Sequence, residues 1–525
     1  MIDGQQRITA LMTSIIGIPV LDKDFKEKVH RIAFNPFLAE EGEPCFEVQS
    51  AAIAKDKRWI KDIAILFSND FNAFQFIPDF CTENPDMEPQ KLNRLIEKVR
   101  DIRNAPIGVI NLDKELSIDK VTEIFIRINS KGASLTQADF VMSTIAADEQ
   151  YGGNMLRKAI DYFCHLFSNP NFMDIVNKDQ DFVKSEYYEK IAWVAKADRS
   201  LFTLSFDDVL RIAFMSKYYR GKMSNLTDLL HGRNFETRKY EDEIMKGSFE
   251  QLKEGVLEVF DKYLYEQFLE CLKDAGFVHT RLIKGRMALN FAYMLFLRLK
   301  KESSVPKWKV AHYVQKWYVL SLLTGRYASS PESWMDSDLR SIREKGFIGF
   351  YEAEMANISD TFWDVTIPQK LETTSSVAPT FNVYTAAQCK EVDSSFLSVG
   401  SKVRDLISSA DIHHIFPKKY LMDNGINSIL DYNQVANYAY LNKAVNIAIG
   451  ATSPQKYFSE ITAAIKEGRE SKYTSIRTVS ELSENLKENC VPLNIESMDF
   501  SDYSNFLVER RKLMAQKIAF YFKSL

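Results

Sequence analysis

The chain has 525 residues, of which 46% are hydrophobic and 26% are charged, and its formal net charge is −4. This length exceeds what one hydrophobic core usually serves, so we expect two or three domains. The composition is typical of an ordinary soluble protein. The balanced charge excludes a uniformly basic nucleic-acid binder, so any contact with DNA must use local patches.

The six cysteines are scattered and include no CxxC pair, so neither a zinc cage nor a disulfide framework is indicated. The longest apolar stretch, residues 287–297, is shorter than a membrane span and is followed by Arg298, which predicts a buried helix. Asp3 and Arg7 interrupt any signal-peptide pattern at the start. We therefore expect a cytoplasmic protein with no membrane partner.

The first part of the sequence mixes strand and helix signals. Apolar residues at helical spacing predict a helix from about residue 5. β-branched residues predict a strand at residues 107–112, and capping residues predict helices at residues 117–131 and 136–147. This part is therefore expected to form a mixed domain.

The rest of the chain reads as helical up to about residue 365, and residues 367–381 read as a connector rich in Ser, Thr and Pro. A helix with one apolar face is predicted over residues 505–525. Its other face could track DNA phosphates or be an ordinary solvated surface. That face carries Arg510, Arg511, Lys512, Lys517 and Lys523.

Two adjacent histidines, His413 and His414, occur in the stretch DIHHIFPKKYL, although the chain has only seven histidines. A single histidine is more often a packing residue than a ligand. Downstream, Asn437 precedes a strand-like segment and Asn446 lies at a predicted helix start. Histidines on one strand, with amides on the loop and helix that follow, are the layout of a ββα-metal nuclease.

These residue types suit the hydrolysis of a phosphodiester, which needs a base for water and a cation for the developing negative charge. A neutral histidine can be that base at cellular pH. Adjacent residues of a strand point to opposite sides, so His413 and His414 could divide the two roles. Asparagine supplies a neutral oxygen that suits a hard divalent ion.

The HHIFP run and the later asparagines resemble the HNH-type nuclease domain at the C-terminal end of GmrSD-type modification-dependent restriction endonucleases. The resemblance implies that His414 is the general base and that Asn437 braces the loop between the strands. It also implies that His413 and Asn446 hold Mg²⁺ or Mn²⁺, with Asn446 where the third HNH residue is often histidine. Asp411 is a rival ligand to His413.

Three further stretches resemble the same family in the same order: DGQQR (3–7), residues 125–141 and residues 317–339. By itself, DGQQR is typical of a polar helix start. Together the stretches resemble the ParB- and sulfiredoxin-like N-terminal domain of GmrSD-type enzymes. Family members carry several tens of residues before DGQQR, so we expect this domain to be incomplete at its N-terminus.

In that family the N-terminal domain is associated with hydrolysis of a nucleoside triphosphate, and no P-loop motif occurs in this chain. A helix N-terminus and arginines suit phosphate groups. The resemblance implies a nucleotide site in which two arginines bind phosphate, an aspartate holds a cation or water, and amides position the ligand. Its residues are Arg7, Arg127, Asp3, Gln5, Gln6 and Asn129.

We therefore predict an α+β, predominantly helical protein. It should comprise a ParB-like domain (1–150), a helical domain (151–365) and an HNH-like nuclease domain (366–525), with the ββα unit embedded in helices. The predicted function is a metal-dependent DNA endonuclease of the phage-defence type, regulated by nucleotide, acting on DNA that can be base-modified, and able to form a homo-oligomer. The alternative is a catalytically inactive subunit that binds DNA or a protein partner.

Overall fold

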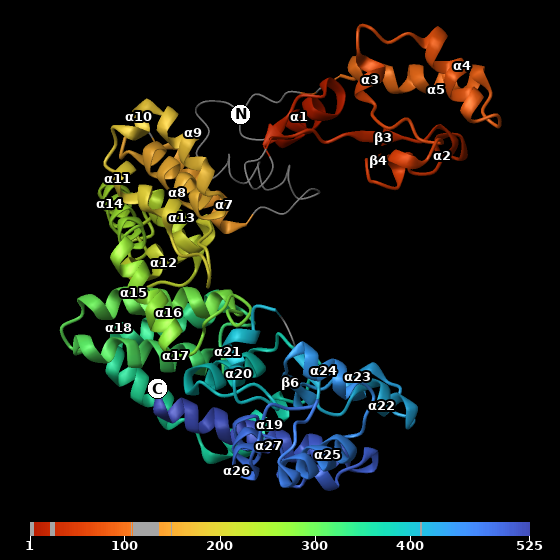
Figure 1. Cartoon of the computed structure of the whole chain (residues 1–525). Helices are drawn as coiled ribbons and strands as arrows, with labels where there is room; N and C mark the ends of the chain where they lie inside the picture. The colour runs from red at the N-terminus through yellow and green to blue at the C-terminus, as the bar shows by residue number, and fades with distance from the viewer. Residues whose placement is uncertain (1–4, 22–26, 107, 109–135, 149, 410–411) are drawn as a thin grey trace. The chain divides into compact units, whose positions relative to one another are not determined.

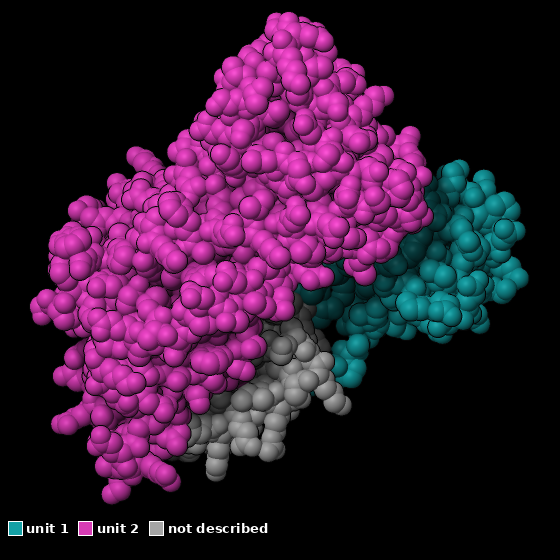
Figure 2. Space-filling view, turned by 90° about the horizontal axis from the view of Figure 1, so that it is seen from below, with its two compact units in different colours: residues 1–136 teal, residues 137–525 magenta. Residues whose placement is uncertain are grey.

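The computed structural model describes residues 5–21, 27–106, 108, 136–148, 150–409 and 412–525. It divides into two compact units, Met1–Thr136 and Gln137–Leu525 (Figure 2). The described elements are mostly helices (Figure 1), and they include three two-stranded antiparallel sheets, so the predicted helical α+β class is confirmed. The three predicted domains, and the ParB-like and HNH-like character of two of them, stay predictions.

The first unit combines two small hairpins with short helices. β3 (Ile32–Phe34) pairs with β4 (Phe46–Val48), and Phe34 lies in a core with Leu66, Leu92 and Ile96. The other described elements are β1 (Val20–Leu21), β2 (Glu27–Lys28), α1 (Gln5–Leu11), η1 (Met12–Ile16), α2 (Pro36–Glu41), η2 (Ile53–Lys55), α3 (Ala64–Phe67), α4 (Ala73–Glu83), α5 (Pro89–Arg100) and η3 (Asp101–Asn104).

The helix predicted from residue 5 is confirmed as α1, which continues into the π-helical turn η1. It ends at Gly17, whose φ of 73° is a left-handed conformation that glycine adopts without strain. The strand predicted at 107–112 lies outside the described residues except for Gly108, and the helix predicted at 117–131 lies wholly outside them.

The second unit begins with α7 (Gln137–Ala147), which confirms the helix predicted at 136–147. Residues 150–365 are largely helical, as predicted. The helices are α8 (Gly153–Ser168), α9 (Met173–Lys178), α10 (Gln180–Val183), α11 (Tyr188–Ile191), α12 (Phe206–Tyr218), α13 (Met223–Leu230), α14 (Asp242–Val259), α15 (Lys262–Asp274), α16 (Arg286–Lys301), α17 (Val310–Thr324) and α18 (Pro331–Ala356). Short 3-10 turns also occur: η4 (Pro170–Phe172), η5 (Ala192–Lys196) and η6 (Lys307–Lys309).

The apolar stretch 287–297 forms the middle of α16, and residues 288–297 are all buried, as predicted. This helix packs against α12 on one side and α17 on the other, so its whole circumference is covered. Its first turn carries Arg286, which pairs with the buried carboxylate of Asp208 on α12. No helix in the described part of the chain is both long and apolar enough to cross a membrane.

The connector predicted over residues 367–381 is confirmed only in its middle, where residues 371–378 lie outside any helix. Its two ends belong to α19 (Ile367–Lys370) and α20 (Pro379–Glu391), and residues 380–389 of α20 are buried. Polar side chains in α20 are satisfied locally, because Thr385 donates to the carbonyl of Phe381 and Asn382 to that of Val377. The Ser- and Thr-rich part of the stretch is therefore a short connection between α19 and α20, and Pro379 marks the start of α20.

The C-terminal part surrounds one short strand pair with helices. β5 (Ile412–His414) and β6 (Tyr438–Tyr440) are antiparallel, and η8 (Val435–Asn437) directly precedes β6. The remaining elements are η7 (Phe362–Thr366), α21 (Val403–Leu406), α22 (Lys418–Asp423), α23 (Ile429–Tyr432), α24 (Lys443–Ile449), α25 (Pro454–Glu467), α26 (Val479–Glu488), η9 (Ile495–Ser497), η10 (Phe500–Asp502) and α27 (Tyr503–Ser524).

The predicted final helix is confirmed as α27, which packs against α19, α20 and η8 (Figure 1). Its predicted apolar face is buried, but the basic face is only partly a surface. Arg510 is 1% exposed, so for this residue both alternatives, a DNA contact and a solvated surface, are wrong. Arg511 lies 3.7 Å from Glu372, and Lys517 lies 2.7 Å from both Glu391 and Asp393. Most of the basic side chains on this face are therefore buried or paired with acidic side chains of the same chain.

Candidate functional site

The two histidines lie on strand β5, and the segment downstream returns to pair with it. His413 is opposite Ala439 and His414 is opposite Tyr438. Asn437 ends η8, immediately before β6, and Asn446 lies within α24, which starts soon after β6. The strand, loop and helix predicted for these four residues are thus confirmed, while their catalytic roles stay predictions.

The His414 ring is fixed by a hydrogen bond and two aromatic contacts. Its Nε2 lies 2.8 Å from Oδ1 of Asn433. The rings of Tyr438 and Tyr432 meet it edge to face, with centroids 5.3 and 6.5 Å away. Burial lowers the pKa of His414 below its usual 6.5; the hydrogen bond with Asn433 opposes this shift, while the charges of His413 and Lys418 add to it. These effects together favour the neutral form of the half-buried imidazole.

Asn437 is fully buried and ties the two sides of the loop together. Its Oδ1 accepts from the backbone N–H of Phe416 at 2.8 Å, and its Nδ2 donates to the carbonyl of Phe416 at 3.1 Å. The same Nδ2 donates to the carbonyl of Tyr432 at 3.3 Å. A buried amide that satisfies three backbone groups fixes the strand ends beside His414, as a loop brace should.

Arg510, on α27, also holds this loop in place through hydrogen bonds to its backbone. Its Nη1 donates to the carbonyls of Ala436 and Tyr438, the two neighbours of Asn437, at 2.9 and 2.7 Å. Its Nη2 donates to the carbonyl of Asn489 at 3.1 Å. The guanidinium of α27 is therefore part of the scaffold of the histidine site, which the sequence did not reveal.

Lys418 supplies an exposed positive charge next to the histidine. Its Nζ lies 4.9 Å from the centroid of the Tyr432 ring, and its charge helps to lower the pKa of His414. The side chain follows Pro417 at the start of α22 and remains accessible. A mobile ammonium at such a place can approach a phosphate group. Sequence reasoning missed Lys418, although it stands next to the HHIFP run.

The predicted metal ligands offer suitable donor atoms. His413 provides an imidazole nitrogen and Asn446 an amide oxygen; both side chains are half-buried, and the Nε2 atom of His413 is buried. The rival ligand Asp411 lies outside the described residues. Among the residues that are described, no three His, Cys, Asp or Glu side chains converge as a metal site. The chemistry fits a divalent ion held by few protein ligands.

The predicted nucleotide site falls largely outside the described part of the chain. Asp3, Arg127 and Asn129 lie among residues that are not described. Gln5, Gln6 and Arg7 form the first turn of α1, so the predicted helix N-terminus is confirmed at the level of the backbone. The nucleotide-binding roles of all six residues stay predictions.

The stretch 317–339, singled out by its resemblance, forms a buried network between α17 and α18. Arg326 binds both oxygens of Asp338, at 2.7 and 2.6 Å, and donates to Glu354 at 2.7 Å. Tyr327 donates to the same Asp338 carboxylate at 2.7 Å and accepts from Trp317 at 3.2 Å. This stretch has a structural explanation that needs no ligand.

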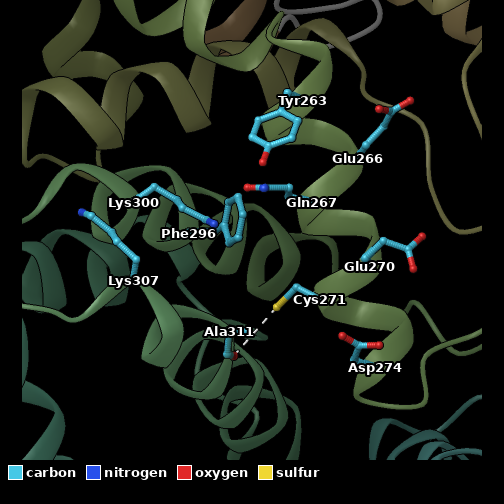
Figure 3. A pocket seen from close by; sticks show the side chains of 10 residues that line it. All are labelled: Tyr263, Glu266, Gln267, Glu270, Cys271, Asp274, Phe296, Lys300, Lys307 and Ala311. Carbon is cyan, nitrogen blue, oxygen red and sulfur yellow. Dashed lines mark hydrogen bonds between the residues drawn. The ribbon is translucent and has the colours of Figure 1, made fainter.

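A cavity of about 320 Å³ opens between α15 and α16 (Figure 3). Glu266, Glu270 and Asp274 lie at its edge on successive turns of α15. Burial raises the pKa of the Cys271 thiol to about 12, so this cysteine is no nucleophile at neutral pH. The described residues that line this cavity do not include a base held by an oriented partner, as His414 is held by Asn433.

Comparison with known families finds a match for the N-terminal part of the chain. Residues 1–146 match the family described as GmrSD restriction endonuclease, N-terminal domain. This match points to a nuclease, hence to an enzyme, of the restriction type, with DNA as its partner. The match ends within α7, so the histidine site lies beyond it. No curated protein and no solved structure matches the chain.

Proposed function

We propose that the chain is an HNH-type, metal-dependent DNA endonuclease of phage defence, in which nucleotide binding or hydrolysis by the N-terminal domain regulates cleavage. The observation that carries the nuclease part is the fixed His414 ring on β5, braced by Asn437 and followed by α24. The match of residues 1–146 supports the restriction class independently of these residues.

In this proposal the neutral His414 ring accepts a proton from water while the water oxygen attacks the phosphorus of a DNA phosphodiester. The bond from phosphorus to the leaving oxygen then breaks. Asn437 does not touch the substrate, but it fixes the ends of β5 and β6 that carry the base. Lys418, exposed beside His414, is placed to neutralise charge on the phosphate.

His413 and Asn446 are the proposed ligands of Mg²⁺ or Mn²⁺, with Asp411 as the rival for His413. The ion, when bound, supplies positive charge that stabilises the phosphate and the leaving oxygen. Having few protein ligands leaves coordination positions open for water and DNA, as a catalytic site requires.

The regulatory part rests on the N-terminal domain. The first turn of α1 contains Gln5, Gln6 and Arg7, and free N–H groups at a helix start favour phosphate. Arg7→Ala is expected to abolish hydrolysis of nucleoside triphosphates by the purified chain and to leave the circular dichroism spectrum unchanged. Arg103→Ala, an exposed arginine of the same unit, is the control. Equal hydrolysis by Arg7→Ala and the parent would show that DGQQR takes no part in nucleotide hydrolysis.

The nuclease is tested with the purified chain, Mg²⁺ or Mn²⁺, and DNA with and without phage-type base modifications, in the presence and absence of nucleotide. The parent should cut or nick DNA, and His414→Ala should not. His30→Ala, which alters an exposed histidine of the other unit, should cut like the parent. DNA binding by the parent without cleavage under every condition would favour the inactive, DNA-binding alternative.

A further inference from the structure

Asn433 is the partner of the proposed base, and nothing in its local sequence marks it. It follows α23 in the segment that links β5 to β6, and it is half-buried. Its Oδ1 lies 2.8 Å from Nε2 of His414. The two residues are brought together only because β6 returns alongside β5.

The segment that carries Asn433 is itself held at several points. The carbonyl of Tyr432 accepts hydrogen bonds from Asn437 Nδ2 at 3.3 Å and from the Tyr503 hydroxyl at 3.3 Å. On the other side, the backbone N–H of Val435 donates to the carbonyl of Thr373 at 2.9 Å. Asn433 therefore presents its amide from an anchored backbone.

The direction of this hydrogen bond decides which ring nitrogen can act. An amide oxygen has no hydrogen to donate, so the proton between the two groups belongs to Nε2 of His414. A neutral imidazole carries one proton, and its lone pair must then reside on Nδ1. The rings of Tyr432 and Tyr438 pack edge to face against the same imidazole.

We infer that Asn433 is a positioning residue that holds His414 in the Nε2–H tautomer, so that Nδ1 is the atom that takes the proton from water. The catalytic role of Nδ1 in this inference rests on the proposed function, whereas the tautomer of His414 can be measured in the protein without DNA. Asn433 does not touch the substrate, and it acts only through the ring.

The first measurement is a two-bond proton–nitrogen NMR spectrum of the full chain with ¹⁵N-labelled histidine, recorded at a pH where the imidazoles are neutral. The His414 signal is assigned from its absence in His414→Ala. We expect the nitrogen shifts of an Nε2–H ring in the parent. Asn433→Asp, which keeps an acceptor, should preserve this pattern. Asn433→Leu, of similar size but without an acceptor, should give mixed tautomers.

The second measurement is cleavage of DNA by the same proteins. Asn433→Leu should lower kcat by about tenfold to a hundredfold, with little change in KM for DNA, because the phosphate contacts remain. Asn433→Asp should retain most of the activity at the pH used for the NMR measurement, where the imidazoles are neutral. Asn427→Leu, an exposed asparagine of the same segment, should match the parent in both measurements.

These measurements distinguish the positioning role of Asn433 from the proposed nuclease function. An Nδ1–H ring in the parent, or full activity in Asn433→Leu, would overturn the positioning role. A parent that never cleaves DNA, although His414 is held as the Nε2–H tautomer, would overturn the proposed function and uphold the hydrogen bond. Loss of activity in Asn433→Leu together with a changed tautomer supports both.

Discussion

The Nη1 nitrogen of Arg510 lies 2.7 Å from the carbonyl oxygen of Tyr438, which joins the middle of α27 to the strand opposite His414. No carboxylate pairs with this guanidinium in the described part of the chain, and burial lowers its pKa. Its charge is stabilised instead by backbone carbonyls. Such an arrangement is costly to disturb, because the carbonyls lose their donor without gaining water.

Arg510→Met should therefore lower the free energy of unfolding by about 3 kcal/mol, as expected for carbonyls left unpaired in a core. Urea denaturation measures this change, and cleavage of DNA should fall with it. Arg511→Met is the control, since Arg511 forms only a 3.7 Å pair with the exposed Glu372 and should change the unfolding free energy by less than about 1 kcal/mol. Equal effects of the two substitutions would contradict the scaffold role.

Metal binding should distinguish the two adjacent histidines. His413→Ala and Asn446→Ala are expected to weaken Mn²⁺ binding by about tenfold or more, and excess Mn²⁺ should partly restore cleavage. His414→Ala should bind Mn²⁺ like the parent, lose cleavage by about two to four orders of magnitude, and resist rescue. Calorimetry and a nicking assay on the three variants decide this. If all three bind metal and cleave normally, the histidine pair serves only in packing.

Lys418 should contribute to binding of the DNA backbone. Replacing it in Lys418→Gln is expected to weaken DNA binding and to reduce the slope of the logarithm of affinity against the logarithm of salt concentration by about one, the change for one lost phosphate contact. Lys419→Gln removes the neighbouring exposed charge and is the matched control. Fluorescence anisotropy over a salt series measures both slopes. Identical slopes for Lys418→Gln and the parent would exclude this contact.

Asp179 in the helical part should contribute stability that depends on pH. Hydrogen bonds from Lys158 and Tyr162, at 2.8 and 2.7 Å, lower the pKa of Asp179 from 3.8 to about 2. Because the folded state favours the ionised form, this stability is present above pH 3.8 and is lost as the pH falls towards 2.

Asp179→Asn should thus lower the free energy of unfolding by about 2 kcal/mol at pH 7, the usual value for a hydrogen bond to a charged group. The difference from the parent should shrink between pH 4 and pH 2. Asp181→Asn, an exposed neighbour, serves as the control in denaturant titrations at each pH. A difference that stays constant over this range would contradict the assigned cause.

The sequence was informative where periodicity or local motif decides the structure. The apolar stripe of α27 and the continuous apolar run of α16 predicted two buried helices correctly. The HHIFP run and the asparagines predicted the β5–β6 pair and the following helix, because strand and helix signals there are local. The family match stops at residue 146, so the HNH-like nuclease character of residues 366–525 stays a prediction.

The failures involve contacts between distant parts of the chain. The start of α20 was taken for part of a connector because the burial of α20 depends on α17 and α27, which the local composition does not show. Arg510 was assigned to a surface because nothing in its own helix reveals the carbonyls of Ala436 and Tyr438. Asn433 lies in a polar stretch typical of any loop, and only the return of β6 brings it to His414.

The support that α27 gives to the histidine site has a consequence for synthesis of the protein. Phe416, just after β5, packs on Tyr503 and Phe506 of α27. Arg510, further along the same helix, donates to the carbonyl of Tyr438 on β6. Residues 412–449 leave the ribosome before α27 does, and until then they lack the contacts that α27 supplies. A nascent chain therefore has only the β5–β6 pairing, Asn437 and earlier segments to hold the histidines, and the support of the site is complete only after α27 folds against it.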